Sequence, residues 1–387
     1  MFTGRYKEIL LLLTILSIAG CKGNKSEEKY KVLHNFDDNS GSKPRGCSLI
    51  FSGDELFGTT ILGGADNGGG AIFSIDTNGQ GYKVLHGFNG TDGSYPSGSL
   101  TLIDKKLFGT TKGGGTEDKG VIFSINTDGT GFKKLLDFNN TNGINPLGLL
   151  TLVGTKLYGI TEMGGKNNGG VIFSMSNDGS EYKKLYDFND TIGSAPVGKL
   201  VYSENKFYGM TSTGGKDGLG VIFSIDTNGK EYKVLMNFAD IKCQYPFESL
   251  ILTGNRLLGL THGKSMDDMI IFSIDTSGNN YKEKYHIMSK GQYENVCSLS
   301  LIGKKLFCVL EYGGSDNNGS IFSIDTNGVG YKSITGFSNA TGIYPYCSLK
   351  LIGNNFYGMA EMGGTHDDGV IFKMDTNFVQ SNTGLQK

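Results

Sequence analysis

Residues 121–138 read VIFSINTDGTGFKKLLDF, and a version of this stretch returns about every fifty residues along the chain. Its first apolar run ends at a polar turn, Asn126-Thr127-Asp128-Gly129, after which a second short run begins. Asn and Asp before Gly favour tight hairpins, and short runs bounded by such turns are typical of β-strands. The Ile-Phe pair begins at seven positions, which are Ile72, Ile122, Ile172, Ile222, Ile271, Ile321 and Ile371. A fixed repeat of roughly this length indicates a solenoid, a propeller or a linear array.

Each repeat divides into four short β-segments, which in the second repeat are residues 99–103, 106–111, 121–125 and 132–138. Four-stranded sheets repeated around an axis form a β-propeller. The chain opens with a fourth strand, Tyr30 to Phe36, and ends with a third, Val370 to Met374. We therefore predict an all-β fold, a seven-bladed β-propeller of four-stranded blades with a one-plus-three strand closure. An open array of hairpins is the alternative, but it would leave sheet edges exposed.

The first twenty residues have the pattern of a secretory leader. Arg5 and Lys7 precede an apolar stretch at residues 9–18, which is shorter than the roughly 20 residues needed to span a bilayer. The ending Ala19-Gly20-Cys21 resembles the lipobox of bacterial lipoproteins, which implies a lipid on Cys21. An ordinary secretory signal with a chance cysteine is the alternative.

These features predict four segments. We expect a lipoprotein signal peptide at residues 1–20, a lipid-anchored tether at 21–29, the propeller at 30–377 and a C-terminal tail at 378–387. The membrane, reached through the lipid, is then one partner of the protein. The expected location is the bacterial cell envelope, at the outer membrane or the cell surface.

Charge and cysteine content narrow the function classes. The chain has 36 Lys and Arg against 38 Asp and Glu, without the basic excess that nucleic-acid binding needs, so we predict no nucleic-acid partner. Beyond the leader only Arg45 and Arg256 remain as arginines, which argues against a sialidase. The cysteines after Cys21 are odd in number, which excludes a full disulfide framework. A Cys297–Cys308 bridge and buried thiols both remain open.

The repeat pattern resembles the GloVer tandem repeat of bacterial surface proteins. The resemblance is plainest in Phe57-Gly58-Thr59-Thr60, Gly63-Gly64, residues 72–79, residues 85–88 and Pro96-Ser97-Gly98. It covers residues 30–377 and recurs in each unit. It implies a propeller-like surface protein. Members of that family occur with different kinds of anchor. It implies no particular activity.

The long loops should share one face of the propeller, because loops between the second and third strands and the blade crossings lie together. At one loop position the repeats differ, reading Ile61, Lys112, Glu162, Ser212, His262, Glu311 and Glu361 in order. His262, Glu311 and Glu361 come from consecutive blades and could converge near the axis. Imidazole and carboxylates could bind a cation or act as an acid/base pair. Solvated loop residues are the alternative.

Aromatic and acidic residues occur on the same face. Tyr245 and Tyr344 lie in blade crossings, where they could stack on sugars, contact a protein or pack between blades. Asp and Asn pairs crowd the loops, and their oxygens suit calcium or sugar hydroxyls as well as ordinary turns. We predict no cofactor and no metal site, with calcium left open. No catalytic residue is identified.

The sequence thus predicts a lipid-anchored cell-envelope propeller that acts as a binding or scaffold module for a glycan or a protein. A glycan-active hydrolase or lyase on the long-loop face is the alternative, so enzymatic activity is left open. A purely architectural envelope component is a third possibility. We name His262, Glu311, Glu361, Tyr245 and Tyr344 as candidate binding residues.

Overall fold

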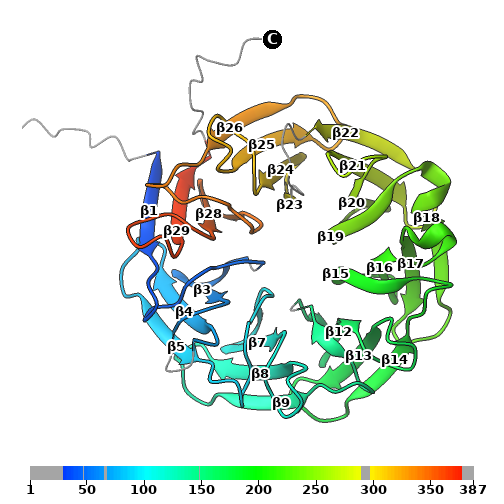
Figure 1. Ribbon diagram of the computed structural model, residues 1–387, viewed down its shortest axis with the longest axis horizontal. Coiled ribbons are helices and arrows are strands. Elements are labelled where there is room, and N and C mark those ends of the chain that lie inside the picture. The colour runs from blue at the N-terminus through cyan, green and yellow to red at the C-terminus, as the bar shows by residue number, and fades with distance from the viewer. Residues whose placement is uncertain (1–28, 47, 65–67, 148, 289–296, 377–387) are drawn as a thin grey trace, which may run out of the picture.

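The computed structural model describes residues 29–46, 48–64, 68–147, 149–288 and 297–376, and within them seven sheets surround one axis (Figure 1). Six of the sheets are built from consecutive strands, so the chain completes one blade before it begins the next. The paired strands within the blades, such as β3 and β4 in blade 1, are antiparallel. The predicted all-β, seven-bladed propeller is confirmed.

The strands follow the predicted repeat. Blades 1 and 2 contain β2 (Ile50–Ser52), β3 (Glu55–Thr60), β4 (Ala71–Asp76) and β5 (Lys83–Gly87), then β6 (Thr101–Ile103), β7 (Lys106–Thr111), β8 (Val121–Asn126) and β9 (Lys133–Asp137). Blades 3 and 4 contain β10 (Ile144–Pro146), β11 (Thr151–Val153), β12 (Lys156–Met163), β13 (Val171–Ser176) and β14 (Lys183–Asp187), then β15 (Ser194–Ser203), β16 (Lys206–Thr213), β17 (Val221–Asp226) and β18 (Lys233–Asn237).

The remaining blades repeat this order. Blades 5 and 6 contain β19 (Gln244–Thr253), β20 (Arg256–His262), β21 (Asp268–Asp275) and β22 (Lys282–Met288), then β23 (Cys297–Ile302), β24 (Lys305–Leu310), β25 (Ser320–Asp325) and β26 (Lys332–Gly336). Blade 7 contains β27 (Lys350–Ile352), β28 (Asn355–Ala360), β29 (Val370–Asp375) and β1 (Tyr30–Asn35). The described residues also include two 3-10 helices, η1 (Lys216–Gly218) and η2 (Phe238–Ile241). Neither these helices nor any other helix in the described part of the chain has the length and apolar character for a membrane span.

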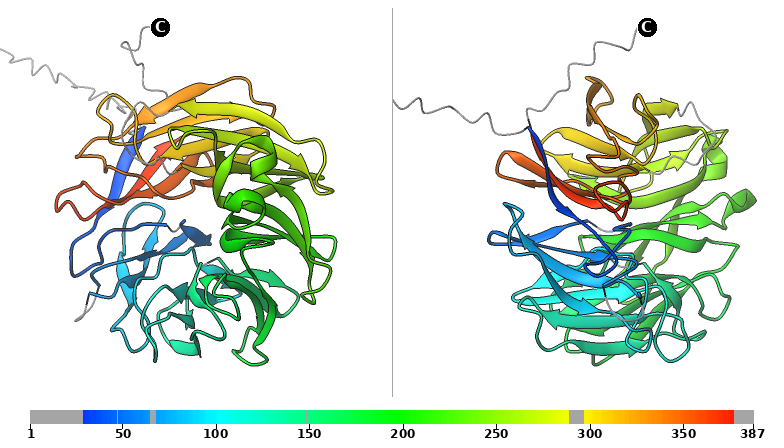
Figure 2. Two further views of the ribbon diagram at one scale, coloured as in Figure 1. Left: turned by 45° about the vertical axis from the view of Figure 1, so that its right-hand side comes forward. Right: turned by 60° about the vertical axis from the view of Figure 1, so that its left-hand side comes forward.

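The ring closes through the first strand. β1 pairs antiparallel with β29, so that Tyr30 faces Met374 and Asn35 faces Val370. The two strands lie side by side in Figures 1 and 2, where β1 is blue and β29 is red. The ring of Tyr30 stacks on Phe372 with centroids 5.3 Å apart. The predicted one-plus-three closure is confirmed.

The glycine of the second strand is required by the aromatic core. Phe123 of the Ile-Phe pair is fully buried and faces Gly109 across the β7–β8 ladder. A Cβ added at Gly109 would lie 2.5 Å from the ζ carbon of the Phe123 ring. The same relationship recurs in blade 1 between Gly58 and Phe73. The repeat therefore keeps a glycine where the neighbouring ring fills the space of a side chain.

Blade 6 has a cysteine at this glycine position. Cys308 faces Phe322 and takes part in a disulfide bond. Its expected partner is Cys297, whose side chain lies outside the described residues, as does Cys47. Cys243 and Cys347 are buried and have reduced thiols.

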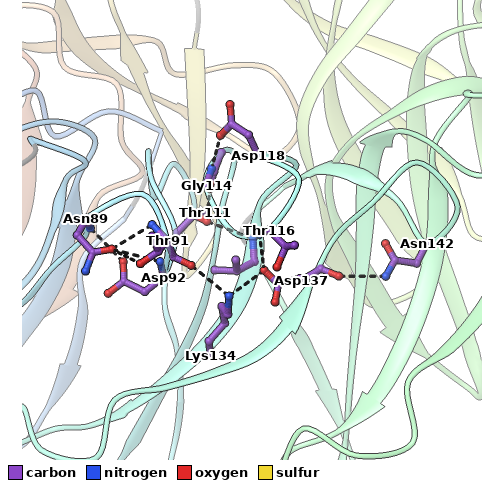
Figure 3. A network of polar contacts seen from close by, with 12 residues as sticks. Asn89, Thr91, Asp92, Thr111, Gly114, Thr116, Asp118, Lys134, Asp137 and Asn142 are labelled. Carbon is purple, nitrogen blue, oxygen red and sulfur yellow. Dashed lines mark hydrogen bonds and ion pairs between the residues drawn. The ribbon is translucent and has the colours of Figure 1, made fainter.

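Polar contacts tie the outer strands to the long loops (Figure 3). Lys134 of β9 donates from Nζ to the carbonyl oxygen of Thr91 at 3.1 Å and to the carboxylate of Asp137 at 3.0 Å. The Asp137 carboxylate also accepts the backbone N–H of Thr116 at 2.9 Å. Lys184 makes the matching contacts one blade further on, to the Thr141 carbonyl and Asp187. The loops on this face are therefore held firmly by the scaffold.

Candidate functional site

The innermost strands of all seven blades line a central channel of about 980 Å³. Serine hydroxyls join these strands from one blade to the next. The backbone N–H of Ser348 donates to Ser48 Oγ at 3.1 Å, and that of Ser48 donates to Ser99 Oγ at 2.6 Å. The N–H of Lys199 donates to Ser249 Oγ at 3.0 Å in the same way. The channel wall is therefore continuous across these blade boundaries.

The long loops and the blade crossings form one rim around the channel. In blade 2 the N–H of Ser94, in the crossing, donates to the Gly113 carbonyl at 2.9 Å, and the Gly113 N–H returns the bond at 3.0 Å. Ser42 and Leu62 form the equivalent pair in blade 1, at 2.8 and 3.1 Å. These backbone hydrogen bonds therefore fix the positions of the residues on the rim.

Three charged residues meet on this rim. Arg45, in the crossing that enters blade 1, places Nε 3.5 Å from Glu361 Oε2 and Nη2 4.0 Å from Glu311 Oε1. Its guanidinium carbon lies 4.8 Å from the ring centroid of Tyr346, which lines the channel. We call Arg45, Glu311, Glu361 and Tyr346 the mouth cluster, because they stand where the channel opens among the long loops.

Burial sets the electrostatics of the mouth cluster. The side chain of Glu311 is only 6% exposed, whereas that of Arg45 is 44% exposed. Burial raises the pKa of Glu311, Arg45 lowers it and the Glu361 carboxylate raises it again, so that the pKa stands above its usual range. Burial also raises the pKa of Tyr346, so its hydroxyl stays protonated and can donate. The cluster thus combines a cation, two unequal carboxylates and an aromatic face.

The structure brings together some of the predicted binding residues. Glu311 and Glu361 share Arg45, and the ring of Tyr344 lies 5.1 Å from that of Tyr312, the residue after Glu311. His262 does not join them through any of its described contacts. Its Nδ1 lies 3.0 Å from the Met266 carbonyl oxygen in its own loop, and its ring lies 4.8 Å from that of Phe247.

Tyr245 stands apart from the mouth cluster in the described contacts. It lies at the start of β19 rather than in a loop, and 39% of its surface is exposed. Its backbone is left-handed, with φ of 48°, and its N–H donates to the Leu219 carbonyl. Its ring is therefore held on the long-loop face and is open to solvent.

The acidic and amide pairs of the loops hold the loops themselves. Asp118 Oδ1 accepts the N–H of Gly114 at 2.6 Å, and Asn168 Oδ1 accepts that of Gly164 at 3.0 Å. Asp367 makes the same bond to Gly363 at 2.9 Å. The pair Asp66-Asn67 lies outside the described residues. Elsewhere in the described chain, no group of three or more His, Cys, Asp or Glu side chains is placed to hold a metal ion.

Sequence reasoning did not select Glu248 as a site residue. It lies in β19 and lines the channel, and burial raises the pKa of its carboxyl to about 7, against a smaller lowering by the Ser249 backbone. Other units have Gly98 and Gly198 after the proline at this position, so the departure is visible in the sequence. From the sequence, Arg45 serves only as evidence against a sialidase.

Sequence comparison identifies a family. The profile of the Gloeobacter/Verrucomicrobia repeat family matches residues 21–124 and, in an overlapping match, residues 66–269. Together the matches span more than half of the chain, and they confirm the resemblance drawn from the repeat pattern. No curated protein matches the sequence.

Solved structures with similar folds have very different sequences. An oligogalacturonate lyase in complex with manganese superposes with a TM-score of 0.56 at 14% identity, covering 87% of this chain and 89% of that one. The oligogalacturonate lyase of Vibrio parahaemolyticus gives 0.55 at 10% identity, covering 91% and 94%. A prolyl endopeptidase gives 0.52 at 12% identity, covering 83% of this chain and 47% of that one. At these identities the likeness shows the fold alone.

Proposed function

The chain belongs to the Gloeobacter/Verrucomicrobia repeat family, and we propose that it is a binding module that takes a glycan at the mouth cluster. The observation that carries this proposal is the placement of Arg45 between Glu311 and Glu361 beside Tyr346, where the channel opens. These residues come from three blades, and the closed ring holds them together.

The chemistry of the mouth cluster suits sugar hydroxyls. Both Arg45–carboxylate separations are longer than an ordinary N–H···O hydrogen bond, so guanidinium N–H groups remain able to donate to a ligand. The carboxylates can accept the hydroxyl hydrogens of the same ligand. The Glu361 carboxylate already balances the charge of Arg45, which favours a neutral ligand over an anionic one. Tyr344 and Tyr346 offer aromatic faces for the apolar face of a sugar ring.

The shape of the site also favours a glycan over a protein surface. Concave sites with a few convergent polar groups are typical of small ligands, whereas protein interfaces are usually broader and flatter. The mouth cluster opens into a channel of about 980 Å³. Oligogalacturonate lyases, which have the same fold, supply a precedent for saccharide chemistry on a propeller.

A glycan screen on the purified protein tests the proposal, followed by titration of the strongest ligand. Tyr344→Ala and Glu361→Gln should each weaken binding by about tenfold, which is about 1.4 kcal/mol. Tyr331→Ala is the matched control, since Tyr331 is 52% exposed on the outer part of blade 6, next to β26. Absence of any glycan ligand, or equal losses for Tyr344→Ala and Tyr331→Ala, would reject a glycan site at the mouth.

Hydrolysis of the bound glycan is a second candidate function, and the unequal carboxylates favour it. Glycosidases use one protonated and one ionised carboxyl group, and the raised pKa of Glu311 suits the protonated role beside Glu361. Cleavage of the bound glycan should then stop in Glu311→Gln while binding persists. If the unaltered protein binds a glycan but does not cleave it, the catalytic proposal is rejected and the binding proposal is retained.

We also propose that lipid on Cys21 anchors the protein in the bacterial cell envelope, at the outer membrane or cell surface. Cys21 lies outside the described residues, so this proposal depends on the leader pattern. An acyl chain contributes about 0.8 kcal/mol per buried CH₂ to membrane binding. Cys21→Ala should therefore shift the protein from the membrane to the soluble fraction and abolish incorporation of labelled palmitate. Unchanged fractionation would reject the anchor.

A further inference from the structure

Two lysines enter the central channel from blades that lie across it from each other. Lys199 stands at the inner-strand position that is Ser48, Ser99 and Ser249 in other blades. Lys350 of blade 7 stands where blade 2 has Thr101. Two departures from the repeat thus place two lysines in the wall of one channel.

The positive charges of the channel are not balanced by the protein. Among the described residues, neither Lys199 nor Lys350 makes an ion pair, and the Lys350 ammonium lies 4.9 Å from the ring centroid of Phe51. Burial and the charge of Lys350 lower the pKa of Lys199, so the two ammonium groups repel each other. Glu248 lines the same channel, but among the described residues it forms no ion pair with either lysine, and burial raises the pKa of its carboxyl. Two like charges that interact across one channel repel each other, and a bound anion would relieve that repulsion.

Serine hydroxyls line the same channel as the two lysines. The oxygens of Ser48, Ser99 and Ser249 each accept a backbone N–H from the neighbouring blade. None of these hydroxyls donates to another residue in the described part of the chain, so their hydrogens can point into the channel. By contrast, Thr101 and Thr151 use their hydroxyls to donate to the carbonyls of Leu150 and Leu200. The channel therefore presents ammonium and hydroxyl donors to anything that enters it.

We infer that the channel between Lys199 and Lys350 is a binding site for a small oxyanion, carried by a phosphate or a carboxylate group. Two ammonium groups and three hydroxyls match the acceptor oxygens of such a group, and charge-assisted hydrogen bonds are the strongest available to it. The site is separate from the mouth cluster, whose arginine is already balanced by the Glu361 carboxylate. The anion site can therefore be confirmed or rejected independently of the proposed glycan site.

Titration of the purified protein with inorganic phosphate, and separately with acetate, tests this inference against sodium chloride at equal ionic strength. We expect saturable binding of at least one probe, and the probe that binds identifies the phosphate or the carboxylate source. Lys199→Gln and Lys350→Gln should each weaken binding at least tenfold. Lys105→Gln, which removes an exposed lysine from a turn, should leave it unchanged. Binding of neither probe, or equal binding in the Lys199→Gln/Lys350→Gln double variant, would overturn the inference.

Thermal melting gives a second readout that does not depend on titration. Without the probe, Lys199→Gln should melt at a higher temperature than the unaltered protein, because it removes the repulsion from Lys350. A saturating probe should stabilise the unaltered protein more than the weaker-binding Lys199→Gln variant. The difference in melting temperature between the two proteins should therefore become smaller or change sign. A melting difference that is the same with and without the probe would also contradict the inference.

Discussion

Glu248 and Gly198 occupy the same place in adjacent blades and share a left-handed backbone, with φ angles of 65° and 68°. Glycine adopts this conformation freely, whereas a residue with a Cβ is strained there by about 1–2 kcal/mol. A Cβ added to Gly198 would also collide with the carbonyl oxygen of Glu248. Glu248 thus combines a strained backbone with a buried carboxyl group. Departures of this kind concentrate at functional sites.

The charge of Glu248 should cost stability at high pH. Its pKa in the folded protein is about 7, above the ordinary value of 4.5, so stability is full below pH 4.5 and is lost as the pH rises through 7. Glu248→Gln should therefore unfold like the unaltered protein at pH 4.5 but be more stable at pH 8, by about 1–3 kcal/mol after allowance for water in the channel. Urea unfolding at the two pH values measures this.

Glu231→Gln is the matched control for the Glu248 prediction. Glu231 also has a left-handed backbone, with φ of 51°, but it is exposed on the surface. Its substitution should change stability equally at the two pH values. A pH-independent effect of Glu248→Gln would show that the carboxyl is not destabilised by burial. Glu248→Gly should add a further gain at both pH values, because it also relieves the backbone strain.

Removal of the closing strand should open the ring. Deleting residues 30–36 removes β1, exposes the edge of β29 and eliminates the Tyr30 hydroxyl bond to the Thr341 carbonyl at 2.7 Å. Unpaired edges promote aggregation, so we expect a lower melting temperature, a broader transition and aggregation by light scattering. Deleting residues 21–29, which precede the strand, should leave melting nearly unchanged. Equal melting of the two truncated proteins would contradict a closing role for β1.

The core glycines should tolerate no side chain. Gly109→Ala would press its methyl group against the Phe123 ring, and overpacking of this kind typically costs about 1–3 kcal/mol. Gly336→Ala is the control, since no atom lies closer than 3.8 Å to the position of an added Cβ. Urea unfolding should therefore show a clear loss for Gly109→Ala and little change for Gly336→Ala. Similar losses would mean that backbone freedom, rather than the ring, requires the glycine.

The repeat predicted the fold because its signals are local. Hairpin turns such as Asn126 to Gly129 and the apolar runs beside them specify each blade, and the orphan strand at Tyr30 to Phe36 specifies the closure. The mouth cluster depends instead on which residues the closed ring brings together. Arg45 belongs to the first blade, and it meets Glu311 and Glu361 only because blade 1 follows blade 7 around the axis.

Three channel residues could have been recognised in the sequence by aligning the repeats at a different strand. Glu248, Lys199 and Lys350 each replace a small or neutral residue of the inner strand, so aligning the units at that strand exposes all three. Alignment at the loop position singled out His262, but its ring packs on Phe247 within its own blade. Spacing alone does not specify the rotamer that decides such a contact.

The two arginines beyond the leader provide the most direct measurement. Arg45 stands in the mouth cluster, whereas Arg256 begins β20 after a tight turn and pairs with Asp275 at 3.0 Å. Calorimetric titration of the strongest glycan ligand should show at least a tenfold loss of affinity in Arg45→Ala and no change in Arg256→Ala. Unchanged affinity in Arg45→Ala, or an equal loss in both variants, would contradict glycan binding at the mouth of the channel.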